Sequence, residues 1–330
     1  MNKNKKILFL SSGDMNTGSH RIWVNDLNLT FKECGFDSTF SNTVPMNIAD
    51  YGIIICGKND VTLAVKLKQA MPFKKVGLIN LAANTIGLPV DFIIVGSHEE
   101  ADSLISAYEN VFLYPLLERM YQTSKNKLKK HEDKEKLIIG FHGHFPHLAK
   151  FEPHLKEALE AFNQSHPIEL LVVTTNLEFD WQVGKPNVPD ITIKKWGLKT
   201  AKKDIMSCDI GVVPNVTTLD VNSKNDIALG LHNTDYAIRF KNKSNAGRCF
   251  VFHQLGIPVV ADFTPSNMHI LSNPDCGMIA HCAAGWVKAF ETLKDFKVRE
   301  HMSLSAWNEF NRLYNPKTWA IRLMGQISNL

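Results

Sequence analysis

Hydrophobic and polar positions along the first 120 residues follow two alternating patterns. Short apolar runs are separated by longer segments in which apolar residues recur every three or four positions, a pattern typical of strands alternating with amphipathic helices. This pattern predicts βαβ units around a parallel sheet. A helix is expected to begin near Ser19 and to stop at Gly35. The predicted strands are residues 7–10, 52–56, 76–80, 92–95 and 111–114.

A polar, lysine-rich segment interrupts this pattern between Tyr121 and Lys136. Its composition favours a solvated linker. The alternation then restarts with the apolar run 137–141, so a second α/β unit with its own first strand is expected. The predicted domains are residues 1–125 and 136–306.

The second half repeats the alternation. Helices are predicted over 153–162, 200–206 and 246–255, and strands over 169–174, 209–213 and 258–261. The polar stretch 214–241 is too long for a plain connection, and long loops often line a site. Helical patterns dominate after Ala283.

Composition restricts the class of protein. The chain has 330 residues, 44% apolar and 21% charged, the ordinary mixture of a globular protein of about two domains. Its apolar runs are much shorter than the ~20 residues that cross a bilayer, and no signal peptide is visible, so a cytoplasmic protein is expected.

Charge and cysteine usage add two expectations. The net charge of +4 suits anionic small molecules or a membrane surface, and no nucleic-acid-binding signature accompanies it. The six cysteines are scattered without metal-ligand spacing, which favours reduced, buried thiols.

Three segments carry candidate chemistry. The first is the turn Ser11–Arg21, between a predicted strand and helix, where ligands of open parallel sheets bind. Asp14 or His20 could transfer a proton there. The alternative is that Ser19 caps the helix and the glycines only permit the turn.

The second segment is the turn 140–150, which contains three histidines and a lysine after a strand. We expect His142, Gly143, His144 and Lys150 to contact phosphate or sugar oxygens. A metal site is the competing interpretation, but Glu152 is the only nearby carboxylate. One or two of the histidines could also simply pack.

The third segment places four cations, at positions 239, 241, 243 and 248, before or at the start of an apolar helix. A helix amino terminus favours negative charge, so a diphosphate would be stabilised by both effects. Lys243, Ser244, Asn245 and Arg248 are therefore the predicted phosphate contacts. A solvated basic face is the alternative.

These segments resemble the donor half of the GT-B glycosyltransferases. The residues that carry the resemblance are the helix and strand 243–261 with Leu255-Gly256-Ile257-Pro258, the segment 205–214 before the long loop, and the turn 140–150. The resemblance implies two Rossmann-like α/β domains that face a cleft, with a carboxyl-terminal helix, about 307–330, that crosses back to the first domain. It also implies a metal-independent enzyme, without a cofactor, that transfers sugar from a nucleotide diphosphate or monophosphate sugar to a hydroxyl of a glycan or lipid-linked acceptor in polysaccharide biosynthesis.

The sequence also departs from that family. The two glutamates that many retaining members carry fall on Lys243 and Val251, and the Arg-x-x-x-x-Lys spacing is matched by His142 and His147. An inverting reaction with His20 or Asp14 as base is therefore favoured.

Three alternatives stay open. The chain could be a nucleotide-sugar epimerase of the same architecture or a non-catalytic nucleotide-sugar-binding relative. The basic segment Lys125–Lys136 offers a peripheral contact with anionic lipid, and a solvated charge run is the other interpretation.

Overall fold

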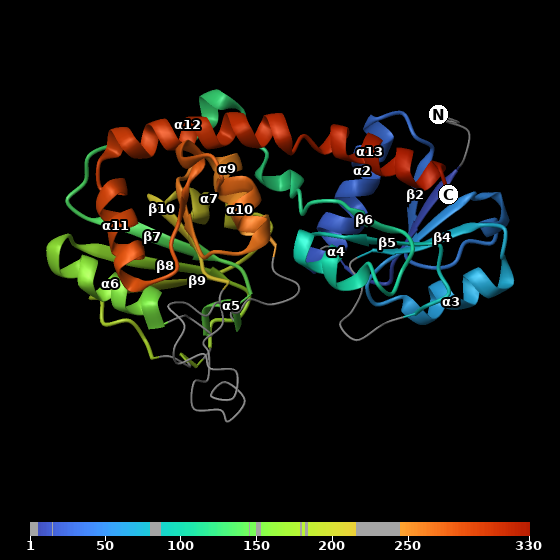
Figure 1. Cartoon of the computed structure of the whole chain (residues 1–330), viewed down its shortest axis with the longest axis horizontal. Coiled ribbons are helices and arrows are strands. Elements are labelled where there is room, and N and C mark those ends of the chain that lie inside the picture. The colour runs from blue at the N-terminus through green and yellow to red at the C-terminus, as the bar shows by residue number, and fades with distance from the viewer. Residues whose placement is uncertain are drawn as a thin grey trace. The chain divides into compact units, whose positions relative to one another are not determined.

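The chain forms two compact units, which are described separately (Figure 1). The computed structural model describes residues 6–14, 16–79, 87–144, 146–149, 153–178, 180–181, 184–215 and 245–330. Unit 1 comprises Met1–Met120, Asn245–Gly247 and Asn311–Leu330, and unit 2 comprises Tyr121–Ser244 and Arg248–Phe310.

Unit 1 contains a six-stranded parallel sheet in the order β2-β1-β3-β4-β5-β6. The five strands predicted from apolar runs are confirmed. The apolar pattern does not predict β2, because its residues Ser-Thr-Phe-Ser form a polar edge strand of which only Ser38 is buried. The strands are β1 (Ile7–Leu10), β2 (Ser38–Ser41), β3 (Ile53–Cys56), β4 (Lys75–Ile79), β5 (Phe92–Val95) and β6 (Val111–Leu113).

The predicted helix after the first strand is confirmed, with one unexpected feature. Its middle, η1 (Arg21–Asp26), winds as a π-helix, a wide turn that is frequent at functional sites. The helix stops before Gly35, whose φ of 80° favours glycine. The other helices of this part of the chain are α1 (Gly18–His20), α2 (Leu27–Glu33), η2 (Ile48–Asp50), α3 (Val61–Ala70), α4 (His98–Leu104), η3 (Arg119–Tyr121) and α13 (Pro316–Ser328).

Unit 2 contains a second six-stranded parallel sheet in the order β12-β11-β10-β7-β8-β9. All strands predicted for this half are present, and β9 and β12 are additional. Both lie at sheet edges, where strands are partly exposed and lack a continuous apolar run. The strands are β7 (Leu137–His142), β8 (Ile168–Thr174), β9 (Asp190–Lys195), β10 (Ile210–Val213), β11 (Val259–Ala261) and β12 (Met278–Ile279).

Helices cover both faces of the second sheet. On one face α6 and α11 pack together, and Phe162 and Phe290 join the apolar side of β7, β8 and β10 in one core. On the other face the Phe252 ring of α9 lies against Gly211. The helices are η4 (Lys125–Lys127), α5 (Pro146–Ala149), α6 (Pro153–Ser165), α7 (Ala201–Met206), α9 (Gly247–Leu255), α10 (Pro265–Leu271), η6 (Pro274–Cys276), α11 (Ala283–Leu293) and α12 (Phe296–Leu313).

The last helix returns to unit 1, as the fold prediction required. The chain re-enters unit 1 at Asn311, near the end of α12, and α13 then packs against α2 (Figure 1). Leu323, Met324 and Ile327 of α13 are buried. The carboxyl-terminal segment is thus an integral part of the first unit.

The lysine-rich segment 121–136, here called the strap, belongs to unit 2. Most of its residues are exposed, in line with the predicted solvated segment, but it is anchored to unit 2 at several points and is not a free linker. Asp209, which is fully buried, accepts a hydrogen bond from Lys134 Nζ at 2.9 Å and pairs with Lys129 Nζ at 3.3 Å. Arg299 Nη2 donates to Glu132 O at 2.7 Å. Lys129 and Lys134 thus have specific partners that composition alone does not reveal, whereas Lys125, Lys127 and Lys130 are exposed.

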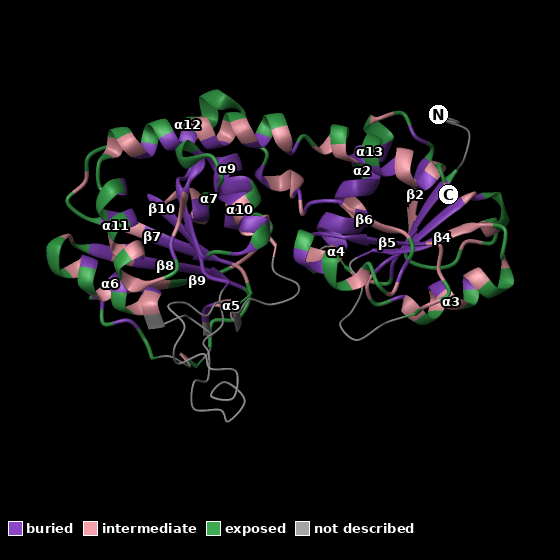
Figure 2. Cartoon of the chain, in the orientation of Figure 1, coloured by how far each residue is buried: buried purple, intermediate pink, exposed green. Residues whose placement is uncertain are grey.

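Both sheets have the strand order of doubly wound, Rossmann-like domains. Their inner strands are buried, whereas most of the covering helices carry an exposed face and α9 is largely buried (Figure 2). The predicted fold class, α/β with two Rossmann-like domains, is confirmed. No helix among the described residues is long and apolar enough to cross a bilayer. None of the six cysteines, all in the described ranges, forms a disulfide.

Candidate functional site

The strand order of unit 2 places its candidate site. From β7 the chain moves to β8 and β9 on one side, and later to β10 and β11 on the other side. In such sheets ligands bind beyond the carboxyl ends of the two strands at this reversal point. Gly143 follows β7, Asn215 lies two residues after β10, and Asp262 follows β11.

Arg248, in the first turn of α9, reaches into this edge of the sheet. Its Nη2 donates to Pro214 O at 3.0 Å and to Asn215 Oδ1. Its guanidinium carbon lies 5.4 Å from the centroid of the Phe141 ring. Asn215 is in turn held by Asp262, whose Oδ2 accepts from the Asn215 backbone N–H at 2.7 Å.

Two buried hydrogen-bond donors at this point have no acceptor among the described residues. Nη1 of Arg248 and Nδ2 of Asn215 are both buried, and neither finds a hydrogen-bond partner in the part of the chain that the structure describes. The two side chains are bonded to each other through their remaining groups, so the two donors belong to one small cluster. Burial lowers the pKa of Arg248 to about 10, which still leaves it charged at neutral pH. A cation with unsatisfied buried donors is a natural anion site.

His142 and Gly143 support Arg248 from the neighbouring strand. The His142 ring is buried against Phe252, and its Nε2 lies 3.3 Å from Arg248 O. Burial, together with the Arg248 charge, lowers the pKa of His142 to about 3, so its ring is neutral and its Nε2–H can donate to that carbonyl. Gly143 has a φ of +136°, and a Cβ there would lie 3.3 Å from Arg248 Cδ. Two of the predicted turns therefore meet at Arg248.

The other predicted donor-binding residues fall into two groups. His144 is exposed, and Asn245 Oδ1 accepts from the Gly247 backbone N–H at 3.1 Å at the start of α9. Lys150, Lys243 and Ser244 lie outside the described residues. Within the described ranges, no group of three His, Cys, Asp or Glu side chains could hold a metal ion.

Unit 1 has its own reversal point, between β1 and β3, and His20 lies there. His20 is buried, its Nδ1 is 3.2 Å from Ser11 Oγ, and its ring packs edge-on against Phe40. Its Nε2 has no hydrogen-bond partner among the described residues. Burial lowers the pKa of His20 below its ordinary value, although Asp14 and Asp60 act in the opposite direction. The ring is thus neutral near pH 7.

Asp14, the other predicted catalytic residue, has a local structural role. Its Oδ1 accepts from the backbone N–H groups of Asn16 at 2.7 Å and Thr17 at 3.2 Å, which shapes the turn before α1. It is exposed, and the hydrogen bonds that it accepts come from Asn16 and Thr17 and not from His20. His20 is therefore the better placed of the two for proton transfer.

The sequence analysis missed several residues of both sites. Asp60 binds the β1 turn through Ser12, accepting from its Oγ at 2.9 Å and its backbone N–H at 3.3 Å. In unit 2 it missed the roles of Asn215 and Asp262. A signal was available, because all three are polar residues within four positions of the end of a buried apolar strand.

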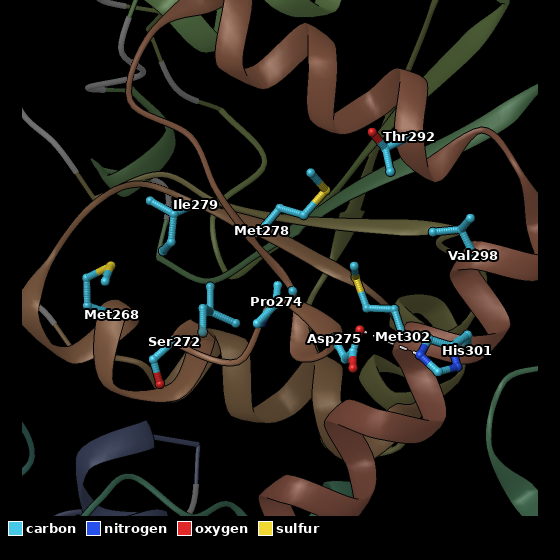
Figure 3. Close-up of a pocket in the computed structure, with 12 residues that line it drawn as sticks. Met268, Ser272, Pro274, Asp275, Met278, Ile279, Thr292, Val298, His301 and Met302 are labelled. Carbon is cyan, nitrogen blue, oxygen red and sulfur yellow. Dashed lines mark ion pairs between the residues drawn. The ribbon is translucent and has the colours of Figure 1, made fainter.

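A separate pocket of about 510 Å³ opens at the β12 edge of unit 2 (Figure 3). Apolar side chains dominate it, including Met278 of β12 and Met302 of α12. Its lining also includes His301 and Asp275, whose Nε2 and Oδ1 lie 3.6 Å apart. With no unsatisfied buried cation, it lacks the features of the Arg248 cluster.

Comparison with known proteins identifies the fold. No protein-family model and no curated protein matches the chain. Among solved structures, HepE from Anabaena, crystallised with UDP and glucose, matches with a TM-score of 0.66 and 12% identity over 99% of this chain and 100% of that one. Sucrose-phosphate synthase from Thermosynechococcus elongatus matches with a TM-score of 0.62 and 13% identity over 98% of each chain. A glycosyltransferase from Rickettsia africae matches with a TM-score of 0.60 and 10% identity over 100% and 99%. The chain thus has the GT-B fold of these glycosyltransferases, as its sequence motifs predicted.

Proposed function

We propose that the protein is a glycosyltransferase that uses a nucleotide diphosphate sugar as donor. The observation that carries the proposal is the pair of buried donors Arg248 Nη1 and Asn215 Nδ2, at the carboxyl edge of the second sheet, which find no acceptor in the described part of the chain. A diphosphate supplies acceptor oxygens and negative charge for both. The fold is that of enzymes crystallised with UDP and UDP-glucose, which supports a uridine nucleotide as the first candidate.

The chemistry follows from the charge that develops on the leaving group. The acceptor hydroxyl attacks the anomeric carbon, the bond between that carbon and the diphosphate oxygen breaks, and the nucleoside diphosphate leaves with both electrons. Donors held in place before the reaction stabilise this charge without reorganisation, and removing one typically costs about 3–4 kcal/mol. Arg248 and Asn215 would act in this way, so we propose that transfer needs no metal ion. Activity that persists in excess EDTA would agree with this, and activity restored only by Mg²⁺ would contradict it.

His20 is the proposed base. A neutral imidazole can accept the proton of the acceptor hydroxyl on Nε2, while Ser11 Oγ holds Nδ1. Because this assignment implies direct displacement, the product anomer should be opposite to that of the donor. Proton NMR of the product tests this, and retention of configuration would exclude the assignment.

Nucleotide binding provides the first test. Thermal-shift screening against UDP, GDP, ADP, dTDP and CMP should show one diphosphate that raises the melting temperature, because a ligand that binds only the folded state stabilises it. Assaying a panel of nucleotide sugars then separates transfer from epimerisation and from binding without turnover. If no nucleotide shifts the melting temperature, the proposal is wrong.

Substitution of Arg248 tests the site itself. Arg248→Gln should weaken nucleotide diphosphate binding at least tenfold, because a charged hydrogen bond contributes ~1.5–3 kcal/mol and each 1.4 kcal/mol is a factor of ten. Asn215→Ala should act in the same direction with a smaller effect. Arg322→Gln on α13, which removes an arginine stacked on Trp319, is the matched control. Isothermal titration that gives equal affinities for Arg248→Gln and the control would refute the assignment.

A further inference from the structure

One surface of unit 2 concentrates positive charge, because the strap runs along α7. Lys202 Nζ of α7 donates to Gln122 O of the strap at 3.0 Å. Lys129 Nζ of the strap donates to Met206 O, at the end of α7, at 3.2 Å. These bonds bring the lysines of the strap beside those of α7 and of the segment that leads into it. We call this set the lysine face, and its members are Lys125, Lys127, Lys195, Lys199, Lys202 and Lys203.

The charges of the lysine face are not offset by acids. No carboxylate of the described residues forms an ion pair with any of its six lysines, whereas the adjacent Lys194 pairs with Asp204 at 3.0 Å. Burial and the positive charge of Lys127 both lower the pKa of Lys202, so like charges lie close together. The other five lysines are exposed. Six charges on one face exceed the net charge of +4 of the whole chain.

The lysine face adjoins the candidate site within the same unit. β9 ends at Lys195, so the residues that follow lie at the carboxyl edge of the sheet, the edge that carries Arg248. Trp196 Nε1 donates to Tyr121 OH at 3.1 Å. The ring centroid of Tyr121 lies 6.4 Å from that of His142, whose Nε2 reaches Arg248 O. A short series of contacts therefore connects the lysine face with the proposed site of transfer.

We propose that the lysine face binds an anionic polysaccharide whose carboxylates or phosphodiesters lie along the strap and α7. The polymer would be the acceptor of the transfer reaction, a part of the inference that rests on the proposed function. Lysine ammonium groups are point charges on flexible stems, so they adapt to anions at irregular spacing. A surface of one sign also attracts a polyanion from a distance and raises its rate of association.

Two other polyanions fit this surface less well. Single-stranded nucleic acid gains affinity by stacking its bases on exposed aromatic rings, but the Trp196 indole is half-buried and bonded to Tyr121. Membrane binding gains strength from inserted apolar side chains. Leu198, the large apolar residue between these lysines, is only 40% exposed. The surface thus offers charge with little stacking or insertion.

Fluorescence anisotropy of labelled oligosaccharides, measured with the full chain and without nucleotide, tests the proposal. An oligogalacturonate, which carries carboxylates, or a glycerol-phosphate oligomer, which carries phosphodiesters, should bind, and the comparison of the two identifies the preferred anion. A neutral dextran of the same length should not bind. Raising NaCl from about 0.1 M to about 0.5 M should weaken the binding, because salt screens exposed charges.

A triple variant locates the binding surface. Lys127→Gln, Lys199→Gln and Lys203→Gln together should weaken binding of the anionic oligosaccharide at least about tenfold, because each exposed charge pair contributes roughly a factor of two to five. In transfer assays this variant should raise the KM for the anionic acceptor and leave kcat unchanged. Its affinity for the nucleotide should equal that of the parent.

The matched control removes the same charge from another part of unit 2. Lys288→Gln, Lys294→Gln and Lys297→Gln replace exposed lysines on or near α11 and should leave the binding unchanged. Both triple variants should keep the melting temperature of the parent, because all six side chains are exposed.

Several outcomes would overturn the proposal: equal weakening by the two triple variants, equal binding of dextran and both anionic oligosaccharides, or tighter binding of single-stranded DNA or anionic vesicles at the same concentration of charge. Failure of the chain to bind any nucleotide would refute the proposed function and the role of the polymer as acceptor. It would not affect the binding of the polymer, which is measured without nucleotide.

Discussion

Arg248 shows how one side chain can be prepared for an anion before the anion arrives. Pro214 O and Asn215 Oδ1 accept hydrogen bonds from Nη2, and the Phe141 ring lies against the guanidinium group. Nη1 alone is left without a partner among the described residues. Together with Asn215 Nδ2 beside it, this buried donor at the carboxyl edge of the sheet fits an anion.

Gly143 should be essential for this arrangement. Gly143→Ala introduces a Cβ 3.3 Å from Arg248 Cδ, at a φ of +136° that side chains rarely adopt. We expect the nucleotide affinity to fall about tenfold or more and stability to fall by ~1–2 kcal/mol. Titration calorimetry and urea unfolding measure the two effects.

Gly184→Ala is the matched control for this substitution. Gly184 also has a positive φ, +86°. A Cβ added there would lie 3.4 Å from Lys156 Cε and would not contact Arg248. It should cost similar stability and leave the nucleotide affinity unchanged. If both variants bind nucleotide equally well, Gly143 does not position Arg248.

At the scale of elements, the strap 121–136 is held to unit 2 by buried polar contacts. His131 Nε2 lies 2.9 Å from both Gly256 O and Ser303 Oγ, and Ser303 Oγ itself donates to Arg299 O. Nε2 therefore carries the proton, and the buried Nδ1 has no partner among the described residues. The strap is as much a part of the unit as its helices.

Asp209 should be the strongest single anchor of the strap. Although burial opposes it, hydrogen bonds from Lys134 and the Ile138 backbone N–H, together with the charge of Lys129, hold the pKa of Asp209 below its ordinary value. Asp209→Asn leaves both lysines without their acid, which costs about 3–5 kcal/mol when a buried pair is broken. Urea unfolding measures this loss, and trypsin should then cut faster within 125–136.

Asp190→Asn is the control, because Asp190 pairs with Lys136 at 2.6 Å on the surface. An exposed pair contributes only about 0–1 kcal/mol. Equal losses for the two variants would mean that the strap is not held by Asp209.

At the scale of the whole molecule, stability should depend on pH through buried histidines. Burial lowers the pKa of His131 to about 4 and that of His142 to about 3, from 6.5. Between these values and 6.5 the unfolded chain binds protons that the folded chain does not, so stability is complete above pH 6.5 and falls as the pH is lowered. Each histidine contributes a slope of up to ~1.4 kcal/mol per pH unit.

Urea unfolding at pH 7.0 and at about pH 5 measures this dependence. His131→Gln removes one titrating group, so the loss of stability between the two pH values should be smaller in the variant than in the parent. A variant with the same pH dependence as the parent would show that His131 is not buried in its neutral form.

The sequence by itself determined which segments are strands and helices, since apolar periodicity is a local property. It also located the turns that contain His20, Gly143 and Arg248. It failed at the edge strands β2, β9 and β12, and it did not reveal that the strap is anchored to unit 2. In these segments, hydrogen bonds to a neighbouring segment of the chain outweigh the conformational preference of the local sequence.

Only the tertiary structure decided which polar groups meet. Asn215 and Arg248 are 33 positions apart, and Lys134 and Asp209 are 75 apart, yet each pair is in direct contact. The physical reason is that strand order brings distant chain segments to one edge of a sheet. The energy of a buried charge then depends on partners that no local pattern specifies.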